Sequence, residues 1–332
     1  MTKPILERAG GDRARRSRVA ARVVLAMIGM VVVPATLTLR TVRTPRPPVD
    51  PSTNPTPLGY TWSLLLYVVP LLVLAVWFLR HPRYTFQKQA FRITVAVLVP
   101  LGIGLDLLFG TMLFTFPNRG AVLGVEVPAV GGSVPAEELV FYAAGFLFVL
   151  LLYVWCDEYW TGAYNVPDYA GESATVERLL RFDPGSLVAG VVLVAAAVAY
   201  KKLLAEDREG FPLYFAYLTA VAVVPSAAFY PSVRRFINWR AFSVTFFFTL
   251  LLSLMWEATL AVPYGWWGYN PRMMTGIFLD GWSGLPLEAV VVWLTVTYTT
   301  VIVFEVVKVY TASGKKAKEA FLGRSQALRT SA

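Results

Sequence analysis

Apolar segments of about 17 to 25 residues recur along the chain, and each is long enough to cross the hydrocarbon core of a bilayer. We place eight of them, at residues 19–39, 60–79, 92–114, 134–155, 185–203, 211–230, 240–262 and 284–308. Hydrophobic residues make up 56% of the chain and charged residues only 15%. The apolar runs are continuous and do not alternate with polar residues. The sequence therefore predicts an all-α polytopic membrane protein with about eight transmembrane helices.

The basic residues indicate how these helices are oriented. The tract "ERAGGDRARRSRVAARVV" precedes the first segment, and no convincing small-residue cleavage site follows. We therefore favour an uncleaved anchor helix over a signal peptide. With a cytoplasmic N-terminus, most of the 30 Lys and Arg residues fall on the cytoplasmic side, as the positive-inside rule requires. We expect a multi-pass protein of the cell membrane with both termini in the cytoplasm. The basic charge then reflects topology and contact with anionic lipid, and argues little for a nucleic-acid partner.

Two parts of the chain match at an offset of 151 residues. The matching pairs are Pro135 with Pro286, Glu137 with Glu288, and Asp106 with Glu257. Each half thus carries an acid within one span and a Pro-x-Glu at the start of the next. Both halves have the same orientation in the predicted topology, so we expect two parallel three-helix repeats around a shared central interface.

The predicted organisation follows from these repeats. Residues 1–58 form a basic N-terminus, the anchor helix and a Pro-rich linker, and residues 59–160 form the first repeat. Residues 161–210 supply an acidic loop and a connector helix. Residues 211–310 form the second repeat, and a basic tail occupies 311–332.

Acidic residues within spans are costly and usually serve a function. The candidates for catalysis are Asp106, Glu137, Glu138, Glu257 and Glu288, with Glu305 near the last cytoplasmic end. No Lys or Arg is predicted deep in a span to neutralise them, so these carboxyls can remain protonated and donate a proton. A Pro-x-Glu is also an ordinary helix start, and Glu138 could be a solvated rim residue because its counterpart is Ala289. The repeat instead singles out Glu137 and Glu288, which we expect to face one shared apolar cavity.

Aromatic residues cluster in sequence around these acids. We predict that Trp256, Phe141, Tyr142, Trp293 and Trp267 bind substrate, because aromatic faces stabilise cations. An interfacial belt is the alternative for Trp266, Trp267 and Trp282. Trp256 stands beside Glu257 within a span, so a role in a cavity is more plausible for it.

The chain offers few residues for other chemistries. It has a single Cys, Cys156, and a single His, His81, so neither a metal site nor a Ser-His-Asp triad is expected. It carries no dinucleotide fingerprint and no P-loop, and we predict no cofactor. Buried acids and aromatic walls suit the proton-initiated cyclisation of a lipid-soluble polyene, a reaction without net redox change.

The motifs "VPAEELVFY" and "LPLEAVVVW", the second preceded by "WWGYNPRMMTGIFLDGWSG", resemble the lycopene cyclases of the heterodimeric bacterial and fused archaeal and fungal type. The resemblance covers about residues 60–310 and implies that two membrane domains together cyclise the ends of lycopene or a related carotenoid. It implies catalytic roles for Glu137 and Glu138 in the first motif and Glu288 in the second. Ala289 departs from the second motif, where an acid is often found.

Other functions fit the same features. A proton-coupled small-solute transporter with 3 + 1 + 3 parallel repeats also uses buried acids, although the spans contain almost no Asn or Gln. A carotenoid- or isoprenoid-modifying membrane enzyme with another product and a non-catalytic partner subunit are further alternatives. A retinal-binding photoreceptor is disfavoured, because Lys308 lies at the end of its span rather than in the middle.

Overall fold

The computed structural model describes residue 29, residues 56–82 and residues 87–323. Within this part the chain is 71% helical. Apart from Gly29, the predicted anchor helix at 19–39 lies outside the described residues, as do most of the Pro-rich linker and the end of the C-terminal tail. The helical fold class predicted from the apolar segments is confirmed.

Six of the described helices are long and apolar enough to cross a membrane. They are α2 (Gly59–Arg80), α3 (Lys88–Leu113), α4 (Ala136–Trp155), α6 (Pro184–Leu203), α9 (Trp239–Trp256) and α10 (Glu288–Ser313). Two of them continue into π-helical turns, α4 into η2 (Cys156–Trp160) and α9 into η4 (Glu257–Ala261). These helices indicate a membrane-associated, multi-pass protein.

The predicted span at 211–230 forms a shorter apolar helix, α7 (Leu213–Ala228). Three further short helices lie among the described residues: α5 (Tyr169–Ala174), α8 (Tyr230–Val233) and α11 (Ala317–Leu322). Phe229 separates α7 from α8, and Pro231 lies in the first turn of α8. Proline lacks the backbone N–H that a continuous helix needs at that position, so it favours a new helix start there.

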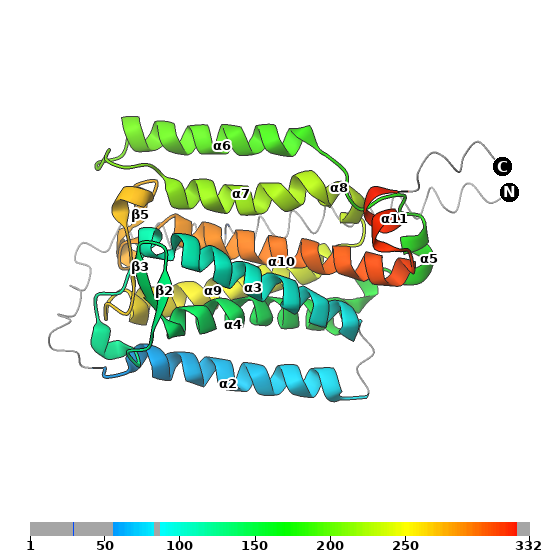
Figure 1. Cartoon of the computed structure of the whole chain (residues 1–332), viewed down its shortest axis with the longest axis horizontal. Coiled ribbons are helices and arrows are strands. Elements are labelled where there is room, and N and C mark those ends of the chain that lie inside the picture. The colour runs from blue at the N-terminus through cyan, green and yellow to red at the C-terminus, as the bar shows by residue number, and fades with distance from the viewer. Residues whose placement is uncertain (1–28, 30–55, 83–86, 324–332) are drawn as a thin grey trace.

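Helix α10 lies at the centre of the bundle, where it packs against α3, α4, α7 and α9. Helix α6 packs on α7 at one side, and α2 packs on α4 at the other (Figure 1). The outer helices keep an apolar surface exposed, for example at Val191 of α6 (70% exposed) and Leu66 of α2 (76% exposed). A surface of this kind suits contact with lipid.

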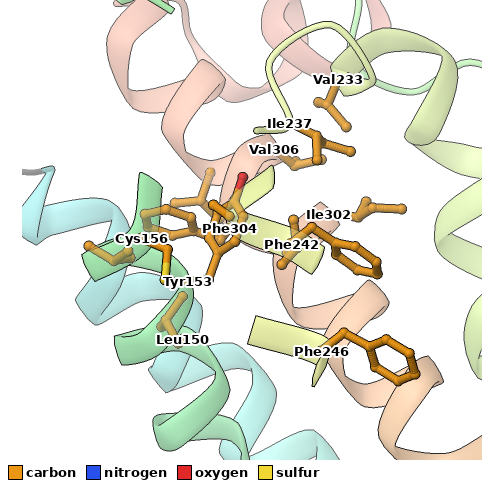
Figure 2. Packing of buried hydrophobic residues seen from close by; sticks show 14 of the residues in the cluster. Leu150, Tyr153, Cys156, Val233, Ile237, Phe242, Phe246, Ile302, Phe304 and Val306 are labelled. Atoms are coloured by element: carbon orange, nitrogen blue, oxygen red, sulfur yellow. The ribbon is translucent and has the colours of Figure 1, made fainter. Parts of the chain in front are cut away.

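Apolar side chains from α4, α9 and α10 pack together in the interior of the bundle. Figure 2 shows Leu150, Tyr153, Phe242, Phe246 and Ile302 meeting there, with Phe304 beside Tyr153. The rings of Tyr153 and Phe304 meet edge to face, 6.1 Å apart, a favoured arrangement for buried aromatic rings. This packing holds the two halves of the chain together.

Three small antiparallel sheets connect the helices, and their strands lie at one end of the bundle (Figure 1). Strand β2 (Glu126–Ala129) pairs with β3 (Gly132–Pro135) ahead of α4, and β5 (Phe278–Leu279) pairs with β6 (Leu285–Pro286) ahead of α10. The third sheet joins the two halves: β1 (Phe114–Thr115) pairs with β4 (Gly268–Tyr269). We call this end of the molecule the strand end.

Candidate functional site

All five predicted catalytic acids are buried. Asp106 lies in α3, Glu137 and Glu138 lie in the first turn of α4, Glu257 begins η4, and Glu288 begins α10. None is more than 5% exposed, so Glu138 is not a solvated rim residue. Among the ion pairs of residues 56–82 and 87–323, none involves these acids.

Glu137 and Glu288 bind the loops that precede their own helices. The Leu123 N–H donates to Glu137 Oε1 at 2.8 Å, and the Thr61 hydroxyl donates to the same oxygen at 2.5 Å. In the other half, the Thr275 N–H donates to Glu288 Oε1 at 2.7 Å. Neither glutamate lines the pocket described below. The expectation that they face one shared cavity is therefore not met, and one carboxylate oxygen of each accepts a backbone N–H instead.

The contact with Thr275 predicts a stability effect at Glu288. Glu288→Ala leaves the buried Thr275 N–H without its acceptor, so we expect a loss of about 1–3 kcal/mol in the free energy of unfolding. Glu288→Gln retains an acceptor oxygen and should lose less. Reversible unfolding in mixed detergent micelles measures both. Equal stability of E288A and the unmodified protein would show that this carboxyl does not hold the loop.

A pocket at the strand end lies between the two halves of the chain. It is lined by two acids, Glu138 and Glu257, and by a largely aromatic wall: Phe114, Phe141, Tyr142, Phe146, Tyr214, Trp267, Tyr269 and Trp293, with Gly145, Val292 and Val296. It contains about 520 Å³ free of protein atoms, including the part open to the surroundings.

Both acids in the pocket accept hydrogen bonds from aromatic side chains. The Tyr60 hydroxyl donates to Glu138 Oε2 at 3.0 Å. The Tyr269 hydroxyl donates to Glu257 Oε2 at 2.5 Å, and the Trp293 indole N–H donates to Glu257 Oε1 at 3.0 Å. Burial, reinforced by the neighbouring Glu257, raises the pKa of Tyr269 well above its usual value. Tyr269 therefore remains a protonated donor at neutral pH.

Asp106 adds a third carboxyl behind the pocket. The Asp106 carboxyl lies within electrostatic range of Glu138. The Tyr142 side chain lies beside the Asp106 carboxyl. Glycine at position 110 makes room for it, because a Cβ there would lie 2.6 Å from Asp106 Oδ1. Asp106, Glu138 and Glu257 thus form one acidic cluster that draws on both halves of the chain.

The predicted substrate-binding aromatics divide between the pocket and the layer behind it. Phe141, Tyr142, Trp267 and Trp293 line the pocket, and Trp256 does not. Trp256 instead stacks on Phe141 with ring centroids 5.5 Å apart, and its indole N–H donates to Ser63 at 2.5 Å. Trp267 is 5% exposed and Trp266 is 3% exposed, so both belong to the interior rather than to an interfacial belt.

Sequence reasoning missed Tyr60 and Tyr214 in this site and gave Tyr269 no role. Tyr60 is the second residue of α2, where an aromatic residue normally indicates the membrane interface. Tyr269 sits in the segment "WWGYNPRMMTGIFLDGWSG" that precedes the second motif. Its pairing with Phe114 brings it to Glu257. Only the tertiary pairing of β1 with β4 reveals that role.

The burial of two lysines was also missed. Lys201 at the end of α6 is fully buried, donates to the Pro271 carbonyl at 3.1 Å and acts electrostatically on Glu288. Lys308 is 1% exposed and forms ion pairs with Asp157 at 3.0 Å and Glu305 at 3.3 Å. The prediction that no Lys or Arg lies deep in a span to neutralise these acids therefore missed Lys308, which pairs with Glu305, and Lys201, which acts electrostatically on Glu288.

Comparisons with known proteins return no matches: no protein-family model, no curated protein and no solved structure is significantly similar to this chain. Among the described residues, no three His, Cys, Asp or Glu side chains are arranged to hold a metal ion.

Proposed function

We propose that this chain is an integral-membrane carotenoid cyclase of the lycopene type. The observation that carries the proposal is the pocket itself, in which Glu138 and Glu257 face an aromatic space and neither forms an ion pair with another described residue. Aromatic walls suit contact with an apolar polyene end, and the two carboxyls face the same space. The resemblance of the Pro-x-Glu motifs to lycopene cyclases supports the same reading.

The proposed reaction begins with proton transfer from Glu138 to the terminal double bond of the polyene. The resulting cation is attacked by an internal double bond, which forms the carbon–carbon bond that closes the ring. Glu257 then removes a proton from a ring carbon, and the electrons of that C–H bond restore a double bond. Atoms and charge balance, because one proton enters and one leaves, so product and substrate are isomers.

Local contacts support this assignment of acid and base. Two donors, Tyr269 and Trp293, point at Glu257, an arrangement that suits a carboxylate ready to accept a proton. Glu138 accepts a hydrogen bond from the Tyr60 hydroxyl and lies near Asp106. Neighbouring carboxyls commonly share a proton. The rings of Phe141, Trp267 and Trp293 can stabilise the intermediate cation through their faces.

The repeat architecture is part of the proposal. Pro135 ends β3 two residues before Glu137, and Pro286 ends β6 two residues before Glu288. Both glutamates accept a backbone N–H from the loop ahead of their helix, at 2.8 Å and 2.7 Å. These matched contacts support two parallel units, α2–α3–α4 and α7–α9–α10, joined by α6. An N-terminal anchor helix and cytoplasmic termini complete the proposed topology.

Expression in cells that accumulate lycopene tests the function. We expect cyclic carotenes in the extracted pigments, separated by chromatography. Cells that express the exposed-residue variant Glu206→Gln serve as a control for expression. Unchanged lycopene, with the folded protein present in the membrane, would refute the cyclase proposal.

The hydroxyl of Tyr269 gives a second test. Tyr269→Phe removes the 2.5 Å hydrogen bond to Glu257 but keeps the ring, so we expect about a 10- to 100-fold lower cyclisation rate. Tyr67→Phe is the matched control, because Tyr67 lies on α2 and is 38% exposed. Equal rates for Tyr269→Phe and Tyr67→Phe would remove Tyr269 from the mechanism.

A proton-coupled transporter is the second candidate function. The observation that favours it is the additional buried charge cluster of Lys308, Asp157 and Glu305, because transporters use such groups to couple protons to transport. Proton-coupled solute uptake into vesicles, combined with unchanged carotenoids in the pigment assay, would favour this candidate over the cyclase.

A further inference from the structure

Four buried threonines on α9 and α10 stand apart from the other hydroxyls of these helices. Thr245, Thr249, Thr297 and Thr300 are each at most 1% exposed, and none has an oxygen or nitrogen hydrogen-bond partner. By contrast, the Ser243 hydroxyl donates to the Trp239 carbonyl at 2.7 Å. An unpartnered buried hydroxyl is costly, and bound water is the usual way to satisfy it.

The four threonines lie on α9 and α10, two helices that are in contact. Those on α9 precede Glu257, one of the two acids in the pocket. On α9, Thr249 and Thr245 lie one turn apart and precede Glu257 by 8 and 12 residues, which places them about 80° and 120° around the helix from Glu257. On α10, Thr297 follows Trp293 by one turn, and Thr300 follows by nearly one more. At 1.5 Å per residue, the α9 stripe extends about 18 Å from Glu257.

Both ends of this polar stripe meet titratable groups. At the strand end, Glu257 accepts the Trp293 indole N–H, which joins α9 to α10. At the other end, Thr245 lies beside the Cys156 thiol, and the next residue is Asp157. Asp157 pairs with Lys308, and its Oδ1 atom is buried without a partner.

We propose that these four hydroxyls bind a file of internal water molecules that carries protons between Glu257 and the cluster of Asp157, Glu305 and Lys308. Side chains four residues apart on a helix lie about 5–6 Å from each other. One water with two hydrogen bonds of about 2.8 Å spans the gap between Thr245 and Thr249. A longer row of water molecules is needed across the eight residues, about 12 Å, from Thr249 to Glu257. Relays of this kind, built from acids and hydroxyls, are the established means of moving protons through membrane proteins.

Each ring closure of the proposed cyclisation leaves one additional proton on Glu257 and one fewer on Glu138. The path removes the proton from Glu257 between turnovers and does not itself return one to Glu138. A proton that leaves Glu257 passes from water to hydroxyl to water, and each group accepts one proton as it releases another. The path itself rests on the geometry of α9 and α10, and it stands whether or not the substrate is a carotenoid.

Proton flux into liposomes tests the path without any carotenoid. The purified full-length protein is reconstituted in phospholipid liposomes that contain a pH-sensitive dye, and a potassium gradient with valinomycin drives protons across. We expect flux above that of protein-free liposomes for the unmodified protein. Thr297→Val should reduce the flux to the protein-free level, and Thr297→Ser, which keeps the hydroxyl, should retain it.

Ser243→Ala is the matched control, because the Ser243 hydroxyl is satisfied by a backbone carbonyl, and it should leave the flux unchanged. Circular dichroism of each variant checks that its helices are intact. The proposal is overturned if the unmodified protein conducts no more than protein-free liposomes, or if T297V conducts as well as T297S. Neither outcome affects the pigment assay, so the two proposals fail separately.

Discussion

Glu138→Gln is expected to lower the rate of ring formation by at least about 100-fold, the lower end of what a positioned general acid contributes. The amide keeps an oxygen for the Tyr60 hydroxyl, which donates to Glu138 at 3.0 Å, but it cannot supply a proton. The fold should therefore remain intact while the chemistry stops. Pigment analysis in lycopene-accumulating cells, normalised to protein in the membrane, measures the effect.

Glu137→Gln is the decisive comparison for Glu138→Gln, because it changes the neighbouring residue in the same way. Glu137 binds the Leu123 N–H and the Thr61 hydroxyl and does not line the pocket. We expect E137Q to reduce stability more than activity per folded molecule. If E137Q abolishes cyclisation while E138Q retains it, the acid is Glu137 and the assignment made from the pocket is wrong.

Lys308→Met is expected to lower the free energy of unfolding by about 3–5 kcal/mol, because it leaves buried carboxylates without their cation. Lys308 bonds Asp157 at 3.0 Å and Glu305 at 3.3 Å, and all three side chains are at most 1% exposed. The network joins η2 to α10, so its loss should loosen the contact between the two halves. Reversible unfolding in mixed micelles provides the measurement.

Lys318→Met is the control for Lys308→Met, since Lys318 lies exposed on α11. It should leave the unfolding free energy within about 0.5 kcal/mol of the unmodified protein. Equal stability of K308M and K318M would mean that the buried network contributes nothing to the fold. Replacing Lys308 and Asp157 together with apolar residues should recover part of the loss, because one unpaired charge is removed.

Six of the eight predicted spans overlap described helices that are long and apolar enough to cross a membrane, because each depends on local hydropathy. The segments predicted at 60–79 and 185–203 lie within one residue of α2 (Gly59–Arg80) and α6 (Pro184–Leu203) at every end. Pro135 and Pro286 likewise precede α4 and α10 as predicted. In both cases the signal is carried by residues adjacent in the chain, so no tertiary information was needed.

The choice between Glu137 and Glu138 could not be made in this way. Successive residues of a helix point about 100° apart, so two adjacent acids in one first turn face different neighbours. The repeat offset singled out Glu137, which is matched to Glu288 because both hold a loop. The pocket selects Glu138 instead, and that depends on how α4 packs between α9 and α10.

The burial of Lys308, at the other end of the bundle, could not be predicted from local sequence either. The sequence places Lys308 at the end of its span, where a lysine normally extends to the membrane surface. In the structure α5 packs against α10, and the Lys308 ammonium lies 4.5 Å from the ring centre of Tyr169 in α5. A segment 139 residues earlier in the chain thus buries the charge, and no local pattern indicates that.

The central claim is that ring closure begins with a proton from the protein and ends with the loss of a different one. It is tested most directly with purified protein and lycopene in liposomes prepared in D₂O, with the product analysed by mass spectrometry. The account predicts a cyclic isomer that carries one deuterium for each ring formed, and no such product with Glu138→Gln. A cyclic product without deuterium, or lycopene recovered unchanged with folded protein present, would contradict it.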